Sequence, residues 1–84
     1  MELTVEISLY PLHDGSENSV LNFIKELKKH SAITVETNGL STQIFGDYDL
    51  IMTKILSEEI KKVLENERAV VIMKLGKGLL HYKA

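Results

Sequence analysis

The first segment of the chain alternates between apolar and polar positions. In residues 2–12, ELTVEISLYPL, every second side chain is apolar as far as Leu9. Successive side chains of a strand point to opposite faces, so this period predicts a β-strand with one buried and one polar face. Pro11 lacks the N–H that a ladder needs, and Asp14-Gly15 follows with turn chemistry. The apolar face consists of Leu3, Val5, Ile7 and Leu9, and the polar face of Glu2, Thr4, Glu6, Ser8 and Tyr10.

Two segments have the period of amphipathic helices. The first follows a turn segment rich in N-cap residues, 13–19, and extends to about His30, with its lysines late, where the helix dipole favours cations. The second begins at an N-cap, Asp47 or Asp49, and closes at residues 66–68. The apolar stripes are Val20, Phe23, Ile24 and Leu27 in the first helix, and Ile51 or Met52, Ile55, Leu56, Ile60, Val63 and Leu64 in the second.

Three further segments have the patterns of strands or strand edges. Residues 32–38, AITVETN, alternate, and Asn38-Gly39 is a strong hairpin signal, so this strand and the next, in residues 40–46, are expected to pair antiparallel. Residues 69–75, AVVIMKL, form a nearly continuous apolar run, which predicts a strand buried on one or both faces. The tail, residues 79–84, could add a short edge segment.

The order of the elements defines the fold class. Strand, helix, strand, strand, helix and strand form two units with right-handed crossovers, which give a four-stranded antiparallel sheet with two helices on one face. This is an α+β fold, a ferredoxin-like βαββαβ sandwich. At 84 residues the chain has room for one core, so we expect a single domain over residues 1–84.

Composition and charge exclude several classes of function. The net charge of −2 offers no bulk attraction to nucleic acid or anionic lipid. The absence of cysteine excludes disulfides, cysteine-based zinc sites and a thiol nucleophile. The chain opens without a signal-peptide pattern, and no apolar run approaches the length of a membrane span. We therefore expect a cytoplasmic protein without nucleic-acid or membrane partners, and its small size favours a homo-oligomer.

The uncovered face of the predicted sheet is the most informative surface. Ser41, Thr42 and Gln43 belong to the third strand, and some of them should join the polar row of the first strand, with Ile44 or Phe45 as an apolar wall. Hydroxyls, an amide, a carboxylate and aromatic rings suit a small polar heteroaromatic ligand. Two plainer interpretations stay open: the face is solvated, as in many antiparallel sheets, or two subunits pack these faces together with the ligand between them.

Catalytic and metal chemistry have little support in the sequence. His13, His30 and His81 lack the spacing of zinc ligands. Asp47 and Asp49 are explained as helix caps, and no nucleophile is accompanied by a base. We expect no enzymatic activity, no metal and no cofactor.

Two segments carry a resemblance to a known family. Residues 2–12, ELTVEISLYPL, and residues 37–49, TNGLSTQIFGDYD, resemble the thiamine- and hydroxymethylpyrimidine-binding proteins of the YkoF type. With the adjoining helices the resemblance covers most of the chain. It implies ferredoxin-like or ACT-like units whose sheets associate, and non-catalytic binding of thiamine or its pyrimidine half in thiamine salvage or transport. Because this chain holds one unit where tandem members hold two, the resemblance implies a homo-oligomer, either a dimer or a tetramer.

The resemblance also points to ligand-binding residues. An aminopyrimidine presents an amine donor beside a ring-nitrogen acceptor, which hydroxyl, amide and carboxylate groups can match, and a carboxylate favours the cationic thiazolium. The matching positions are Glu6, Ser8, Tyr10, Thr42 and Gln43.

A second class of function stays open. An ACT-like regulatory or oligomerisation module would bind an amino acid or no ligand. Its site would lie at strand–helix loops and interfaces, here around residues 13–18, HDGSEN, and not on the open face.

Overall fold

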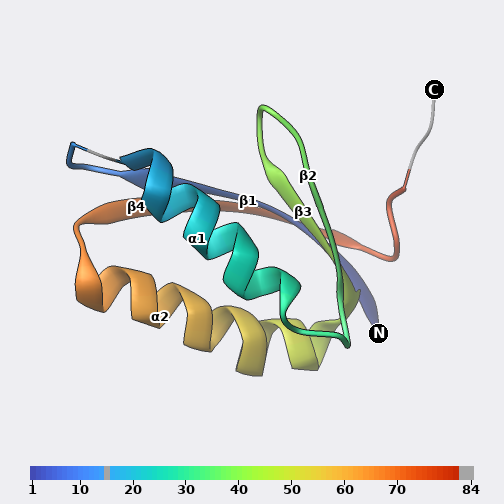
Figure 1. Cartoon of the computed structure of the whole chain (residues 1–84). Helices are drawn as coiled ribbons and strands as arrows, with labels where there is room; N and C mark the ends of the chain where they lie inside the picture. Colours follow the sequence, from blue (N-terminus) through green and yellow to red (C-terminus); the bar gives the residue numbers. More distant parts are fainter. Residues whose placement is uncertain (15, 82–84) are drawn as a thin grey trace.

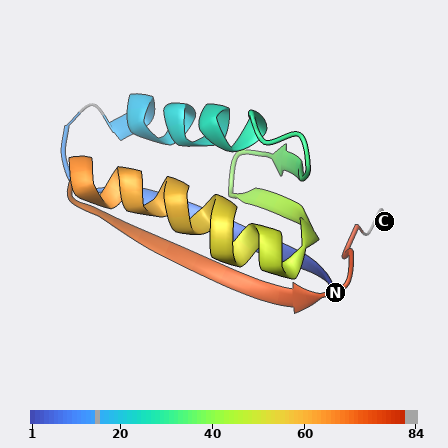
Figure 2. The same cartoon turned by 90° about the horizontal axis from the view of Figure 1, so that it is seen from below.

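The computed structural model of the chain describes residues 1–14 and 16–81. The ferredoxin-like α+β fold expected from the sequence is confirmed: the sheet has four antiparallel strands in the order β2-β3-β1-β4, and the helices lie together on one of its faces (Figures 1 and 2). The elements are β1 (Glu2–Pro11), α1 (Ser16–Lys28), β2 (Thr34–Thr37), β3 (Thr42–Asp47), the π-helical turn η1 (Leu50–Ile55), α2 (Leu56–Asn66) and β4 (Ala69–Lys77).

The core lies between the sheet and the helices. β1 is one of the two inner strands, and its alternating apolar side chains point toward the helices, as the sequence pattern predicts. Removing apolar surface from water is the main favourable contribution to folding, so this layer holds the sheet and helices together. The buried apolar residues that form it are Leu3, Val5, Ile7, Leu9, Phe23, Leu27, Ile44, Ile51, Ile55 and Leu56.

The connections into β3 and out of it follow local polar chemistry. The hairpin between β2 and β3 is confirmed, but residues 38–41 connect the strands, so the loop is wider than a two-residue turn. Asn38 closes this loop, since its Oδ1 accepts hydrogen bonds from the N–H groups of Leu40 (2.8 Å) and Ser41 (3.2 Å). After β3, Oδ2 of Asp47 accepts from the N–H of Leu50 at 3.2 Å and caps the start of η1.

β4 differs from its prediction. Its apolar run predicted a strand buried on one or both faces, but β4 lies at the edge of the sheet and much of its apolar surface is exposed on both faces. That prediction is wrong. A continuous apolar run is typical of a strand that is covered on both faces, but in this chain no element covers both faces of β4 among the described residues.

The segment after β4 turns back over the open sheet face. It forms no strand as far as His81, and residues 82–84 of the predicted edge segment lie outside the described residues. The Thr4 hydroxyl donates to the carbonyl of Gly78 (2.8 Å) and accepts from the N–H of Leu80 (2.9 Å). The His81 ring stacks on Phe45, with ring centroids 3.6 Å apart. This segment therefore covers one end of the open face.

Candidate functional site

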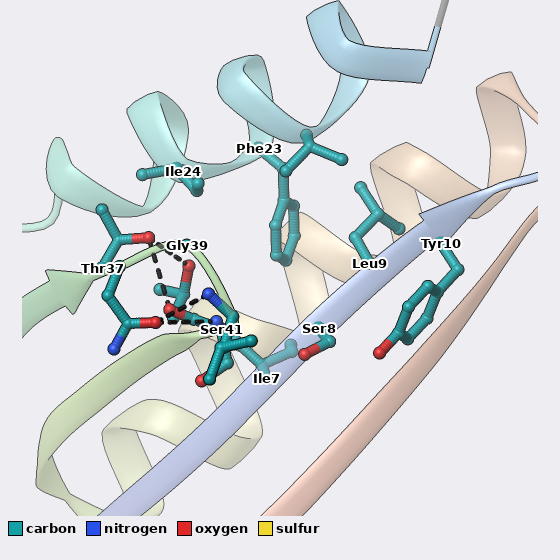
Figure 3. Close-up of a pocket in the computed structure, with 13 residues that line it drawn as sticks. Ile7, Ser8, Leu9, Tyr10, Phe23, Ile24, Thr37, Gly39 and Ser41 are labelled. Carbon is teal, nitrogen blue, oxygen red and sulfur yellow. Dashed lines mark hydrogen bonds between the residues drawn. The ribbon is translucent and has the colours of Figure 1, made fainter. Parts of the chain in front are cut away.

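A cavity of about 130 Å³ lies where β1 runs past the end of β3. Three walls enclose it: the second half of β1, helix α1 and the loop between β2 and β3 (Figure 3). Figure 3 shows the Phe23 ring pointing from α1 toward β1, between Ile24 and Leu9. The lining side chains are Ile7, Ser8, Leu9 and Tyr10 of β1, Val20, Phe23 and Ile24 of α1, and residues 37–42.

The β1 wall offers an unpaired strand edge. β3 pairs with β1 only as far as Ile7, which lies opposite Thr42, whereas β4 pairs with β1 as far as Pro11. The Leu12 N–H donates to the carbonyl of Arg68 at 2.9 Å, on the β4 side. The N–H and C=O groups of successive residues point alternately to the two sides of a strand, so those of Leu9 point to the opposite side, toward the cavity. A ligand there can pair with backbone groups as an added strand would.

Hydroxyl groups surround this edge. Thr42 is only 5% exposed, and its Oγ1 lies 3.1 Å from Oγ1 of Thr37. Ser8 is half-buried, and Tyr10 is exposed at the rim. These side chains can both donate and accept hydrogen bonds, and Phe23 supplies an aromatic surface. The cavity therefore combines polar groups of both kinds with an apolar wall.

A second set of polar residues lies on the open face beside the cavity. Glu6 accepts a hydrogen bond from the Ser41 hydroxyl at 3.1 Å and pairs with Lys74, whose Nζ lies 3.7 Å away. Gln43 is its cross-strand partner in β3. A shallow hollow of about 310 Å³ adjoins these side chains and reaches Leu80 in the segment after β4. We call Glu6, Ser41, Gln43 and Lys74 the open-face cluster.

The predicted ligand-binding residues divide between these two places. Ser8, Tyr10 and Thr42 line the cavity, and Glu6 and Gln43 lie in the open-face cluster. Thr42 does not lie on the open face, since it is opposite Ile7 and shares the helix-covered side of the sheet. The period of two along β3 accounts for this, because Ser41 and Gln43 point to one face and the residue between them to the other.

Some residues of the cavity were not predicted as part of a site. Phe23 and Ile24 carry only the helical period, which is the same for a core side chain and for a cavity wall. Asn38 carries only a turn signal, although its side chain fixes the loop that forms one wall. Ser41 belongs to the predicted polar stretch, and in the structure it both lines the cavity and donates to Glu6. The sequence contains no signal that separates it from its polar neighbours.

The size of the cavity limits what it can hold. An enclosed protein cavity of about 150 Å³ binds benzene, and this cavity, of about 130 Å³ and open on one side, is close to the size of one six-membered ring. A larger ligand must extend beyond the cavity. Ser41 lines the cavity and also donates a hydrogen bond to Glu6 on the open face.

Comparison with known proteins supports the fold. The sequence matches no protein-family model and no curated protein sequence. A hypothetical protein of Methanocaldococcus jannascii aligns with a TM-score of 0.76 and 29% identity, over 99% of this chain and 87% of that one. A "putative thiamine biosynthesis/salvage protein" of Thermotoga maritima aligns with a TM-score of 0.75 and 20% identity, over 93% and 85%. A domain of unknown function, DUF77, from Bacillus cereus aligns with a TM-score of 0.67 and 16% identity, over 99% and 77%.

These structures share the ferredoxin-like fold with this chain. One of them carries a name that refers to thiamine.

The loop around residues 13–18 has its own polar contacts. The Ser19 hydroxyl donates to Oε2 of Glu67 at 2.9 Å, and Nε2 of His13 lies 3.1 Å from the other carboxylate oxygen. The carbonyl of Asp14, followed by Glu67, raises the pKa of His13 above its ordinary value. These contacts engage His13 and Ser19 with Glu67. An amino-acid site of the ACT type in this loop stays a prediction.

Two general features bear on partners. In the described part of the chain, no three metal-ligating side chains come together. Among the same residues, no helix has the length and apolar character to cross a bilayer.

Proposed function

We propose that this chain binds thiamine without catalysis, by taking the aminopyrimidine half into the cavity beside β1. The observation that carries the proposal is the unpaired edge of β1 at Leu9, which opens into a ring-sized cavity lined by the hydroxyls of Ser8 and Thr42. The thiamine-related name of a structure with the same fold supports this choice of ligand, as does the resemblance of residues 2–12 and 37–49 to proteins of the YkoF type.

The chemistry of the pyrimidine matches the cavity walls. Its exocyclic amine needs an acceptor and its adjacent ring nitrogen a donor, and the C=O and N–H of Leu9 offer this pair side by side. Ser8 and Thr42 can bind the remaining polar atoms, and Phe23 packs against the ring. Each neutral hydrogen bond contributes about 0.5–1.5 kcal/mol, so several together are needed for useful affinity.

The rest of thiamine would lie outside the cavity. The cationic thiazolium would extend past Ser41 to the open-face cluster, where Glu6 supplies a negative charge. Free hydroxymethylpyrimidine, which lacks the thiazolium, would occupy the cavity alone. The proposed role is in thiamine salvage or transport in the cytoplasm, by a homo-oligomer that is a dimer or a tetramer.

Isothermal titration calorimetry with hydroxymethylpyrimidine tests the cavity. The unmodified chain should bind saturably, and Thr42→Val and Ser8→Ala should each weaken binding about 3- to 10-fold, as the loss of one hydrogen bond predicts. The matched controls are Thr53→Val and Ser57→Ala, which make the same changes at exposed positions on η1 and α2. Equal affinity in all variants would place the ligand elsewhere, and no heat with any pyrimidine would refute the proposal.

A further inference from the structure

Phe45 is a buried aromatic ring on the open face of the sheet. The preceding residue, Ile44, belongs to the core between the sheet and the helices, so Phe45 points to the opposite face. Its exposed fraction is nevertheless only 3%. The His81 ring, in the segment after β4, stacks on it. We call residues 78–81 the strap, and the strap supplies a cover that the helices do not.

Two rows of side chains cross the open face from β2 to β4. Residues directly opposite one another in antiparallel strands share a face, so the register of the sheet defines both rows. The polar row consists of Glu36, Gln43, Glu6 and Lys74. The platform row beside it consists of Thr34, Phe45, Thr4 and Gly76.

The strap lies over the platform row. On β4, Gly76 has no side chain, and a Cβ there would lie 2.6 Å from Cδ1 of Leu80, so the glycine leaves room for the strap. On β1, the Thr4 hydroxyl donates to the carbonyl of Gly78 at 2.8 Å and accepts from the N–H of Leu80 at 2.9 Å. The open face therefore determines the path of the strap and delivers His81 to β3.

The His81 ring occupies a position that suits a planar nitrogen heterocycle. Its plane lies 20° from that of Phe45, with the ring centroids 3.6 Å apart. Its Nδ1 lies 3.6 Å from Oε1 of Glu36, the end of the polar row on β2. The aromatic face favours a flat ring, and the carboxylate favours an N–H at the edge of that ring. These two groups together define a chemical class of ligand.

Few contacts hold the strap on the sheet. The pairing of β4 with β1 ends at Lys77, and no strap residue belongs to the core between the sheet and the helices. Leu80 is 40% exposed, and so is the His81 side chain. Segments with few buried apolar contacts open locally at little cost in free energy. A ring that competes with His81 therefore displaces the strap and leaves the core intact.

We infer that the face of Phe45 beside Glu36 is a binding position for a planar nitrogen heterocycle with a ring N–H, and that His81 occupies it as an intramolecular competitor. A ligand there replaces the His81 ring and lifts the strap from Thr4. The hollow of about 310 Å³, which Leu80 lines, then opens toward the platform row. Neither Phe45 nor Glu36 lines the cavity beside β1, so this inference does not depend on the proposed binding of thiamine.

NMR titration of the labelled full chain with benzimidazole tests the position. Benzimidazole carries a ring N–H and a second ring nitrogen, as histidine does. Its two fused rings are larger than the single six-membered ring whose size the cavity beside β1 matches. We expect saturable shifts at Phe45, Glu36 and Leu80. The N–H of Leu80 should also exchange faster with solvent in the presence of benzimidazole, because it leaves the Thr4 hydroxyl.

Removal of the competitor gives the sharpest prediction. His81→Ala should bind benzimidazole about 3- to 10-fold more tightly than the unmodified chain, because one aromatic pair no longer has to be broken. His13→Ala, the same change at an exposed position in the loop after β1, should leave the affinity unchanged. Circular dichroism should show the same fold in both variants.

The carboxylate is tested in the His81→Ala background. Glu36→Gln should weaken benzimidazole about 3- to 10-fold, because the charge that favours the ring N–H is lost. Glu65→Gln, the same change at an exposed position on α2, should have no effect. Equal affinity of His81→Ala and the unmodified chain, an affinity that Glu36→Gln does not alter, shifts confined to the cavity beside β1, or no binding of benzimidazole would each overturn the inference.

Discussion

The hydroxyl of Ser41 donates a hydrogen bond to Oε2 of Glu6 across 3.1 Å. Ser41 also lines the cavity beside β1, whereas Glu6 belongs to the open face. This contact therefore links the cavity beside β1 to the open-face cluster. A ligand with a ring in the cavity and a cation outside it would follow this path.

Glu6 should distinguish thiamine from its pyrimidine half. Glu6→Gln removes the negative charge but keeps the size of the side chain and an acceptor for Ser41. Thiamine binding should weaken about 3- to 10-fold, because a charge-assisted contact to the thiazolium is lost, whereas hydroxymethylpyrimidine should bind as before. Calorimetric titration of both ligands checks this. Equal weakening for the two would show that Glu6 acts on the pyrimidine.

Glu59 should be the carboxylate whose loss destabilises the fold most. It is only 3% exposed between α1 and α2, and it accepts hydrogen bonds from His30 (3.0 Å) and Lys62 (3.2 Å). Glu59→Ala should lower the free energy of unfolding by about 2–3 kcal/mol, the worth of charged hydrogen bonds at a buried group. Urea denaturation measures the difference. Glu58→Ala, the exposed neighbour, should change it by less than about 0.5 kcal/mol, and equal costs for both would contradict this role.

The same group predicts a dependence of stability on pH. Burial alone would raise the pKa of Glu59, but hydrogen bonds from His30 and Lys62 outweigh it, so the pKa in the folded state lies below the ordinary value. The stabilisation is therefore complete above the pKa of the unfolded chain and is lost as the pH falls through the folded pKa. Melting temperatures recorded from neutral to acidic pH should decline less steeply for Glu59→Gln than for the unmodified chain. Parallel declines would show that Glu59 does not titrate in this range.

His13 should have a pKa above the ordinary value of histidine. The Asp14 carbonyl and then Glu67 raise its pKa. Glu67→Gln should lower the pKa of His13 only part of the way, because the carbonyl contact, 2.7 Å from Nδ1, remains. NMR titration of the imidazole protons of His13 measures this. A pKa of His13 that is unchanged in Glu67→Gln would show that the carboxylate has no part in the shift.

Gly76 should control how the segment after β4 lies on the open face. A Cβ at this position would lie 2.6 Å from Cδ1 of Leu80, so Gly76→Ala must move that side chain. The cost to stability should be below about 1 kcal/mol, because the displaced atom ends a flexible side chain. The N–H of Leu80, which donates to Thr4, should then exchange faster. Unaltered exchange of this amide would mean that the segment adapts without leaving Thr4.

The fold was predictable because each element carries a local signal. The alternation in residues 2–9, the helical stripe from Val20 to Leu27 and the Asn38-Gly39 hairpin depend only on neighbouring residues. The exposure of β4 was not predictable in this way. Burial of Ile72 or Leu75 depends on what lies beside the strand, and an exposed apolar edge strand has the same sequence pattern as a buried strand.

The candidate site was predictable only in part for a related reason. The polar side chains of residues 41–43 indicated a polar surface, and alternation places Gln43 beside Glu6. The cavity exists because the pairing of β3 with β1 stops at Ile7, one residue before Ser8. Asn38 also holds the loop between β2 and β3 beside Phe23. The length of a strand pairing and the path of a loop are tertiary features, which no local pattern encodes.

The central claim is that the aminopyrimidine half of thiamine binds in the cavity at the free edge of β1. Chemical-shift mapping of the labelled full chain during titration with thiamine tests it most directly. The account predicts saturable shifts at the amides of Ser8, Leu9 and Thr42 and in residues 38–41, with further shifts at Glu6 that hydroxymethylpyrimidine does not cause. Absence of shifts with both ligands, or shifts confined to α2 and β4, would contradict it.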